Sequence, residues 1–150
     1  MFSFFKNHFL SKKEIARILE CIRENESYTS GEIRIYIEKH CSESEASIKA
    51  KEIFHQLKMY NTQNRNAVLT YIAYKDKVFC LHGDKAIFEK IDAAFWQNQS
   101  AALATYFSKK ENVRGIIHCI QQLGNQLITH FPSQQGEQKN ELPDDIIFGK

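Results

Sequence analysis

Three short polar stretches of this chain combine residue types that can do chemistry together. A Gly-Asp-Lys run at residues 83–85 stands where an apolar stretch gives way to a helical pattern, and Glu32 and the pair Arg65–Asn66 each precede an apolar stretch. Carboxylate and amide oxygens are ligands that a hard divalent cation prefers, and guanidinium and ammonium groups bind phosphate. If the fold brings the three stretches together, they can hold a cation, a phosphate or both.

The spacing of the apolar residues predicts the elements that must position these groups. Capping boxes formed by Ser11 with Glu14 and by Ser42 with Glu45 open two amphipathic helices. Period-two alternation and nearly continuous apolar runs predict strands. The expected order is helix, strand, helix, strand, strand and then helices to residue 131, with the strands in 29–39, 67–74 and 78–82.

That order predicts an α/β fold with a small mixed sheet between layers of helices. Strand–helix–strand connections make parallel neighbours, and the turn at residues 75–77 makes the third strand antiparallel to the second. The starts of the first two strands and the end of the third then share one edge of the sheet, which we call the amino-terminal edge. The residues expected to gather there are Glu32, Arg65, Asn66, His82, Gly83, Asp84 and Lys85.

Several of these residues also fit purely structural roles. Asp84 fits the N-cap of a helix and Gly83 a tight turn. Glu32 and Arg34, two apart on one strand face, fit a surface ion pair, which contributes about 0–1 kcal/mol. The rival location for a site is the opposite, carboxyl-terminal edge, where ligands usually lie in open α/β sheets. That edge carries Glu38, His40, Cys41, Glu43 and Asp76.

Length and composition limit the class of protein. A chain of 150 residues with a net charge of +2 is the size of one domain, and so small a charge does not indicate a nucleic-acid partner. No apolar run reaches the ~20 residues of a membrane helix, and polar residues break the opening "MFSFFKNHFL" before it can form a signal peptide. We therefore expect a cytoplasmic protein with one domain over residues 1–131 and a tail over 132–150 that contains a docking segment.

Five segments, in their order and spacing, resemble the TPM-domain family in a short, stand-alone bacterial form. They are "TSGEIRIYIE", "FHQLKMYNTQNRNAVLTYIAY", "FCLHGDKAIFEKI", the "FW" at 95–96 and "HFP…NELPDD", and together they extend from about residue 11 to residue 148. The resemblance implies an α/β/α sandwich of Rossmann-like appearance around a small mixed sheet. It also implies a disputed function, because the family includes members linked to phosphatase activity, to calcium binding and to the assembly or repair of larger complexes.

The resemblance points to residues that coincide with the amino-terminal edge. The matching family positions are Gly31, Glu32, Arg34, Arg65, Asn66, Gly83 and Asp84. The chain departs from the family at Ala86, where glycine is usual, and at His82, where an apolar residue is common. The loop "KHCSESEAS" also lacks the Asp-Pro pair often found there, so glutamates are its only acids.

The first functional hypothesis is a phosphatase that acts on a small phosphomonoester. Asp84, Glu32 and Asn66 would hold a divalent cation, Ca²⁺ or Mg²⁺, that polarises a phosphoryl oxygen and activates water. Arg65 or Lys85 would bind the phosphate and neutralise its charge, which makes Asp84, Glu32 and Arg65 the catalytic residues. No organic cofactor is expected.

The second hypothesis is a non-catalytic module. It would bind calcium, another divalent cation or a protein partner, and would assist the assembly or repair of a larger complex. "NELPDD" and exposed aromatic side chains would form its recognition surface. Nothing in the sequence resembles a Ser-His-Asp nucleophile–base arrangement, and fold analogy alone is a weak guide to chemistry.

Overall fold

The structure, a computed structural model, describes residues 9–133 and 145–149. Most of the predicted tail, including residues 140–144 of "NELPDD", lies outside this described part. The elements in chain order are α1 (Lys12–Glu26), β1 (Glu32–Glu38), α2 (Ala46–Gln56), β2 (Ala67–Ala73), β3 (Val78–Gly83), α3 (Lys85–Lys90), α4 (Ala93–Ser108), α5 (Asn112–His130) and β4 (Ile146–Phe148). None of the described helices is long and apolar enough to cross a membrane.

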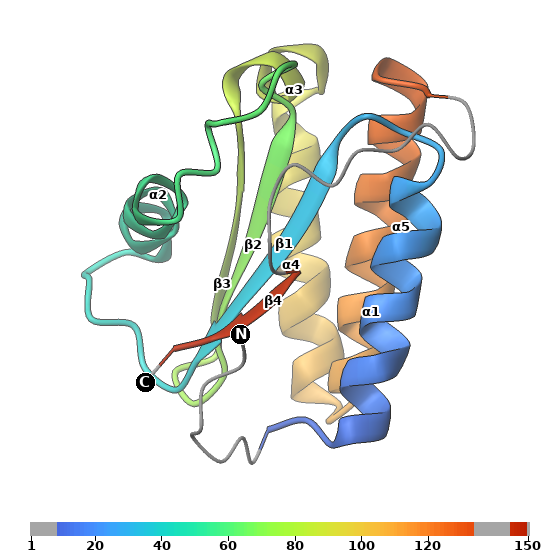
Figure 1. The fold of residues 1–150 in the computed structure, drawn as a ribbon. Coiled ribbons are helices and arrows are strands. Elements are labelled where there is room, and N and C mark those ends of the chain that lie inside the picture. Colours follow the sequence, from blue (N-terminus) through green and yellow to red (C-terminus); the bar gives the residue numbers. More distant parts are fainter. Residues whose placement is uncertain (1–8, 134–144, 150) are drawn as a thin grey trace.

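The strands form one mixed sheet in the order β3-β2-β1-β4. β1 is parallel to both β2 and β4, and β2 is antiparallel to β3. Helices α1, α4 and α5 cover one face of the sheet, and α2 covers the other (Figure 1). The α/β sandwich predicted from the sequence is therefore confirmed, and β4 adds a fourth strand on the far side of β1.

The alternation of β1 divides its side chains between two hydrophobic clusters. Ile33, Ile35 and Ile37 are buried in the larger cluster, which also contains the inner faces of α1, α4 and α5. Tyr36 packs against the smaller cluster, which is built around α2. β2 is buried at every position, as expected for a strand that is covered on both faces.

One of the two predicted capping boxes is present. Ser11 accepts a bond from the Glu14 N–H through Oγ at 3.1 Å, and Glu14 Oε1 accepts the Ser11 N–H at 2.8 Å. The second capping box is wrong, because α2 begins one turn later with Glu45 at its N-cap and no side-chain cap bond. The Ser42 hydroxyl instead accepts a bond from Lys49 Nζ at 2.9 Å, so a side chain of the helix uses the acceptor.

Gly83 lies at the close contact between β3 and α4. It ends β3 in the sheet rather than forming the tight turn considered above, and a Cβ added to it would lie 2.5 Å from Cη2 of Trp96. Carbon atoms in ordinary contact are about 3.5–4.0 Å apart, so any side chain here must push α4 away. Glycine at residue 83 therefore sets the distance between the sheet and the start of α4.

We expect Gly83→Ala to lower the free energy of unfolding by about 1–3 kcal/mol, because the added methyl group overpacks the contact with Trp96. Urea unfolding measures this change. The same substitution in a Trp96→Phe background should cost less, since the smaller ring leaves room for the methyl group. An equal loss in both backgrounds would show that Trp96 is not the reason for the glycine.

Candidate functional site

The three strand ends meet at the amino-terminal edge, as the topology predicts. Glu32 at the start of β1 is aligned with Ala67 at the start of β2. The Asp84 N–H, just beyond β3, donates to the Ala67 carbonyl at 2.9 Å. Glu32, Ala67 and Asp84 therefore form one row across the sheet, and the loop that ends in Arg65 and Asn66 lies beside it.

Asp84 and Arg65 form a two-pronged ion pair. Arg65 Nε donates to Asp84 Oδ2 at 2.7 Å, and Arg65 Nη2 donates to Oδ1 at 3.0 Å. The Lys85 N–H also donates to Oδ1 at 2.8 Å, which makes Asp84 the N-cap of α3. The Asp84 side chain is only 5% exposed, while that of Arg65 is 38% exposed. The N-cap interpretation is confirmed, and the carboxylate charge is also neutralised by Arg65.

The backbone of Arg65 supports the same junction. Its φ of 50° lies in the left-handed region, which is uncommon for a residue with a side chain. Its carbonyl accepts the Ala86 N–H at 3.1 Å. Arg65 thus binds the start of α3 through its side chain and its backbone, and this double attachment fixes the loop before β2 against the helix after β3.

A small amide network lies beside the ion pair. Nδ2 of Asn66 and Nδ2 of Asn64 each donate to Ser30 Oγ at 3.1 Å. Asn66 is fully buried, and its Oδ1 has no hydrogen-bond partner. The sequence did not single out Ser30 or Asn64 as members of a site, because each is also an ordinary loop residue.

Glu32 and Arg34 are both buried, so the surface location predicted for this pair is wrong. Both side chains share a face of β1 with Tyr36, which packs against the smaller cluster, so this face is not the solvent-exposed one that the surface pair requires. Glu32 and Asp84 lie two strand spacings apart, which is about 10 Å between their backbones. Lys85 is exposed at the start of α3, and Gly31 lies just before β1 against Leu127.

The geometry of the amino-terminal edge adds no support to the predicted metal ligands. The described residues contain no group of three or more His, Cys, Asp or Glu side chains that could hold a metal ion. A cation at Asp84 would have to compete with the Arg65 guanidinium for the same oxygens. The proposed ligand set of Asp84, Glu32 and Asn66 therefore stays a prediction.

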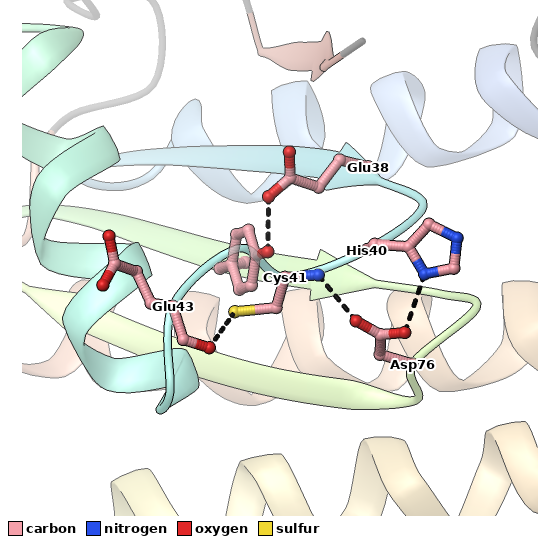
Figure 2. Close-up of polar contacts among 6 residues, drawn as sticks. Glu38, His40, Cys41, Glu43 and Asp76 are labelled. Carbon is pink, nitrogen blue, oxygen red and sulfur yellow. Dashed lines mark hydrogen bonds and ion pairs between the residues drawn. The ribbon is translucent and has the colours of Figure 1, made fainter.

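The carboxyl-terminal edge is held together by Asp76 (Figure 2). His40 Nδ1 lies 2.8 Å from Asp76 Oδ1, and the Cys41 N–H donates to Oδ2 at 2.7 Å. The bond with His40, and after it the bond from Cys41, lowers the pKa of Asp76 below its ordinary value. These bonds fasten the loop after β1 to the turn between β2 and β3.

The other carboxylates of this edge do not converge on Asp76. The Glu38 carboxylate accepts a bond from the Tyr71 hydroxyl and lies 3.9 Å from Lys49 Nζ. Burial, together with the bond to Glu38, raises the pKa of Tyr71. Figure 2 shows the Glu43 carboxylate turned away from Asp76, while its backbone carbonyl accepts from Cys41 Sγ at 3.6 Å. At the carboxyl-terminal edge, the polar groups thus hold loops in place through hydrogen bonds and ion pairs.

Glu26 is a buried acid that the sequence analysis missed. It is 1% exposed at the end of α1, and its Oε2 accepts the Ile33 N–H at 2.7 Å. Burial raises its pKa to about 8. Its position in the sequence could have indicated a buried acid. Glu26 continues the apolar stripe of Ile18 and Ile22 at helical spacing, where an acid is unexpected.

Comparison with known proteins gives a family and a close structural neighbour. The family model of the TPM domain matches residues 4–126. The NMR structure of the BA42 protein from the psychrophilic bacterium Bizionia argentinensis is 35% identical, with 98% of this chain and 100% of that chain covered and a TM-score of 0.84. The N-terminal domain of the cg2496 protein from Corynebacterium glutamicum has a similar fold at 10% identity, with coverages of 90% and 83% and a TM-score of 0.63. No curated protein gave a significant match.

The two roles of Asp84 can be separated by two substitutions. Asp84→Asn keeps an N-cap of similar strength and loses the charge that pairs with Arg65, whereas Asp84→Ala loses both. We expect Asp84→Ala to reduce the free energy of unfolding by about 0.5–2 kcal/mol more than Asp84→Asn, measured by urea unfolding. If the two variants are equally stable, the cap contributes nothing.

Proposed function

This chain belongs to the TPM-domain family, and we propose that it acts as a non-catalytic domain that binds a protein partner. The observation that supports this most is the state of Asp84, the central residue of the catalytic hypothesis. Its two oxygens accept bonds from Arg65 Nε, Arg65 Nη2 and the Lys85 N–H. A carboxylate that must hold a metal needs lone pairs free of such donors, and this one is already used to join β3, α3 and the loop before β2.

The amino-terminal edge also offers a surface that suits a protein partner. Four large apolar side chains are exposed among the described residues, and three of them lie at this end: Tyr28 at 43%, Tyr60 at 39% and Phe88 at 53%. We call these three residues the aromatic end. They precede β1, precede β2 and follow β3 respectively, so each belongs to the end of the sheet where those strand ends lie. Aromatic and arginine side chains are enriched at protein interfaces.

The aromatic end is held in place by its neighbours. The Phe88 ring stacks on Trp96 with their centroids 5.8 Å apart, and the Tyr60 ring lies 5.9 Å from the ring of His55. A side chain that is already ordered loses little entropy on binding, which favours affinity. Exposed Lys58 and Lys85 lie in the same region as the half-buried Arg65. We therefore propose a partner that presents apolar and acidic side chains.

Site-specific photo-crosslinking tests this proposal. A photoreactive phenylalanine analogue placed at Phe88 or at Tyr60 should give a discrete crosslinked protein in the cells that produce this chain. The matched control is Ile48, which is 40% exposed on α2 near the opposite edge and should give no such product. Equal products from residues 88 and 48, or none from 88 and 60, would contradict the proposal.

The second candidate is the cation-dependent phosphatase of the first hypothesis. The observation that favours it is Asn66 Oδ1, a fully buried oxygen that has no hydrogen-bond partner and lies in the residue next to Arg65. An amide oxygen in that state is a suitable ligand for a hard cation. Arg65 pairs with Asp84, the residue before Lys85, so both cations lie near the place where a phosphate would bind.

A hydrolysis assay separates the two candidates. With para-nitrophenyl phosphate and Ca²⁺, Mg²⁺ or Mn²⁺, the binding proposal expects release of product at the rate of the protein-free control, with no change in Asp84→Asn. The phosphatase candidate expects saturable turnover that requires one of the cations and is lost in Asp84→Asn. Retention of turnover in that variant would remove Asp84 from any catalytic role.

A further inference from the structure

The outer edge of β1 is covered by the shortest strand of the sheet. β4 has three residues, and its neighbours complete the ladder. The Ile35 N–H donates to the Asp145 carbonyl at 2.8 Å, and the Gly149 N–H donates to the Ile37 carbonyl at 2.7 Å. Ile146 is buried in the larger hydrophobic cluster. A strand this short depends on every interaction at its ends.

Glu26 lies on the same edge of β1, next to the start of β4. In a parallel ladder, the N–H groups that point to one neighbour recur at every second residue, which on this side of β1 are Ile33 and Ile35. The Ile35 N–H bonds to Asp145, while the Ile33 N–H bonds to Glu26 Oε2 at 2.7 Å. A side-chain carboxyl group from α1 thus takes the ladder position adjoining β4.

The charged groups around Glu26 disfavour its ionised form. Glu32 on β1 and Asp145 beside β4 are acids that raise its pKa, and Arg23 on α1 itself acts in the opposite direction. Arg23 Nε lies 3.9 Å from Asp145 Oδ2, at a mostly exposed position. α5, which also packs on α1, contributes none of these charges. Burial has the largest effect and raises the pKa of Glu26. The bond from the Ile33 N–H has the next largest effect and lowers it.

We propose that Glu26 is a proton-operated latch for β4. In its neutral form the carboxyl group lets Asp145 and β4 dock against β1. In its ionised form the buried carboxylate lacks the hydration that its charge requires and also repels Asp145, and the docked strand is released from the edge.

The direction of the pH dependence follows from the two states of Glu26. Docking holds its pKa at about 8, compared with an ordinary value of 4.5 once water reaches the carboxyl group. The docked state therefore binds the proton more tightly, and docking is fully favoured below pH 4.5. It weakens as the pH rises to about 8, by at most about tenfold per pH unit, and this group causes no further change above that.

Amide hydrogen exchange, measured by NMR on the full chain between pH 5.5 and pH 9, tests the latch. Exchange rates are divided by the intrinsic rates at each pH, so that only protection is compared. Protection of the Ile35 and Gly149 amides should fall as the pH rises towards 8, because both bonds cross between β1 and the β4 segment. The Asp84 amide, which bonds to Ala67 across the β2–β3 pair, should keep its protection.

Two variants make the result specific to Glu26. Glu26→Gln keeps a carbonyl oxygen for the Ile33 N–H but cannot ionise, so protection of Ile35 and Gly149 should become independent of pH. Asp145→Asn removes the facing charge and should reduce the pH dependence without abolishing it. An unchanged pH dependence in Glu26→Gln, or a parallel loss of protection at Asp84 in the wild type, would overturn the proposal. If Glu26→Gln does not fold, an unchanged pH dependence of protection in Asp145→Asn would overturn the proposal.

Discussion

The structure depends on the burial of β1 between two parallel neighbours. This strand has the sequence EIRIYIE, and six of its seven residues are buried, including three that are charged. Taking a charged group out of water costs several kcal/mol unless partners compensate for it. The chain meets this requirement by bringing polar groups to β1 from other elements. The Tyr71 hydroxyl and the Lys49 ammonium group, for example, reach the carboxylate of Glu38.

The same principle accounts for both edges of the sheet. At the amino-terminal edge Asp84 is neutralised by Arg65, and at the carboxyl-terminal edge Asp76 is bound by His40 and by the backbone of Cys41. Each acid joins segments that are far apart in the sequence, because its partner comes from another loop. Asp84 and Asp76 thus join loops to the ends of the sheet, and the exposed side chains near the amino-terminal edge include aromatic rings and cations as well as Glu89.

The sequence was sufficient for those features that local pattern determines. Alternation and apolar runs predicted the three main strands, and their order predicted which ends share an edge. Features that depend on distant contacts were missed. Glu32 and Arg34 are buried rather than exposed, and no local pattern around residue 32 indicates this. Likewise, proximity of Arg65 to Asp84 was expected, but their two-pronged pairing was not, because it requires the left-handed backbone at residue 65.

The pairing of β4 with β1 also sets the order in which the sheet can be completed during synthesis. β1 is made early, whereas the residues that cover its outer edge, 146–148, come more than a hundred positions later. Until residue 148 has left the ribosome, the nascent domain presents β1 as an open strand with unpaired N–H and carbonyl groups. Such an edge can pair with another chain, so the emergence of these residues closes a site at which misassembly can begin.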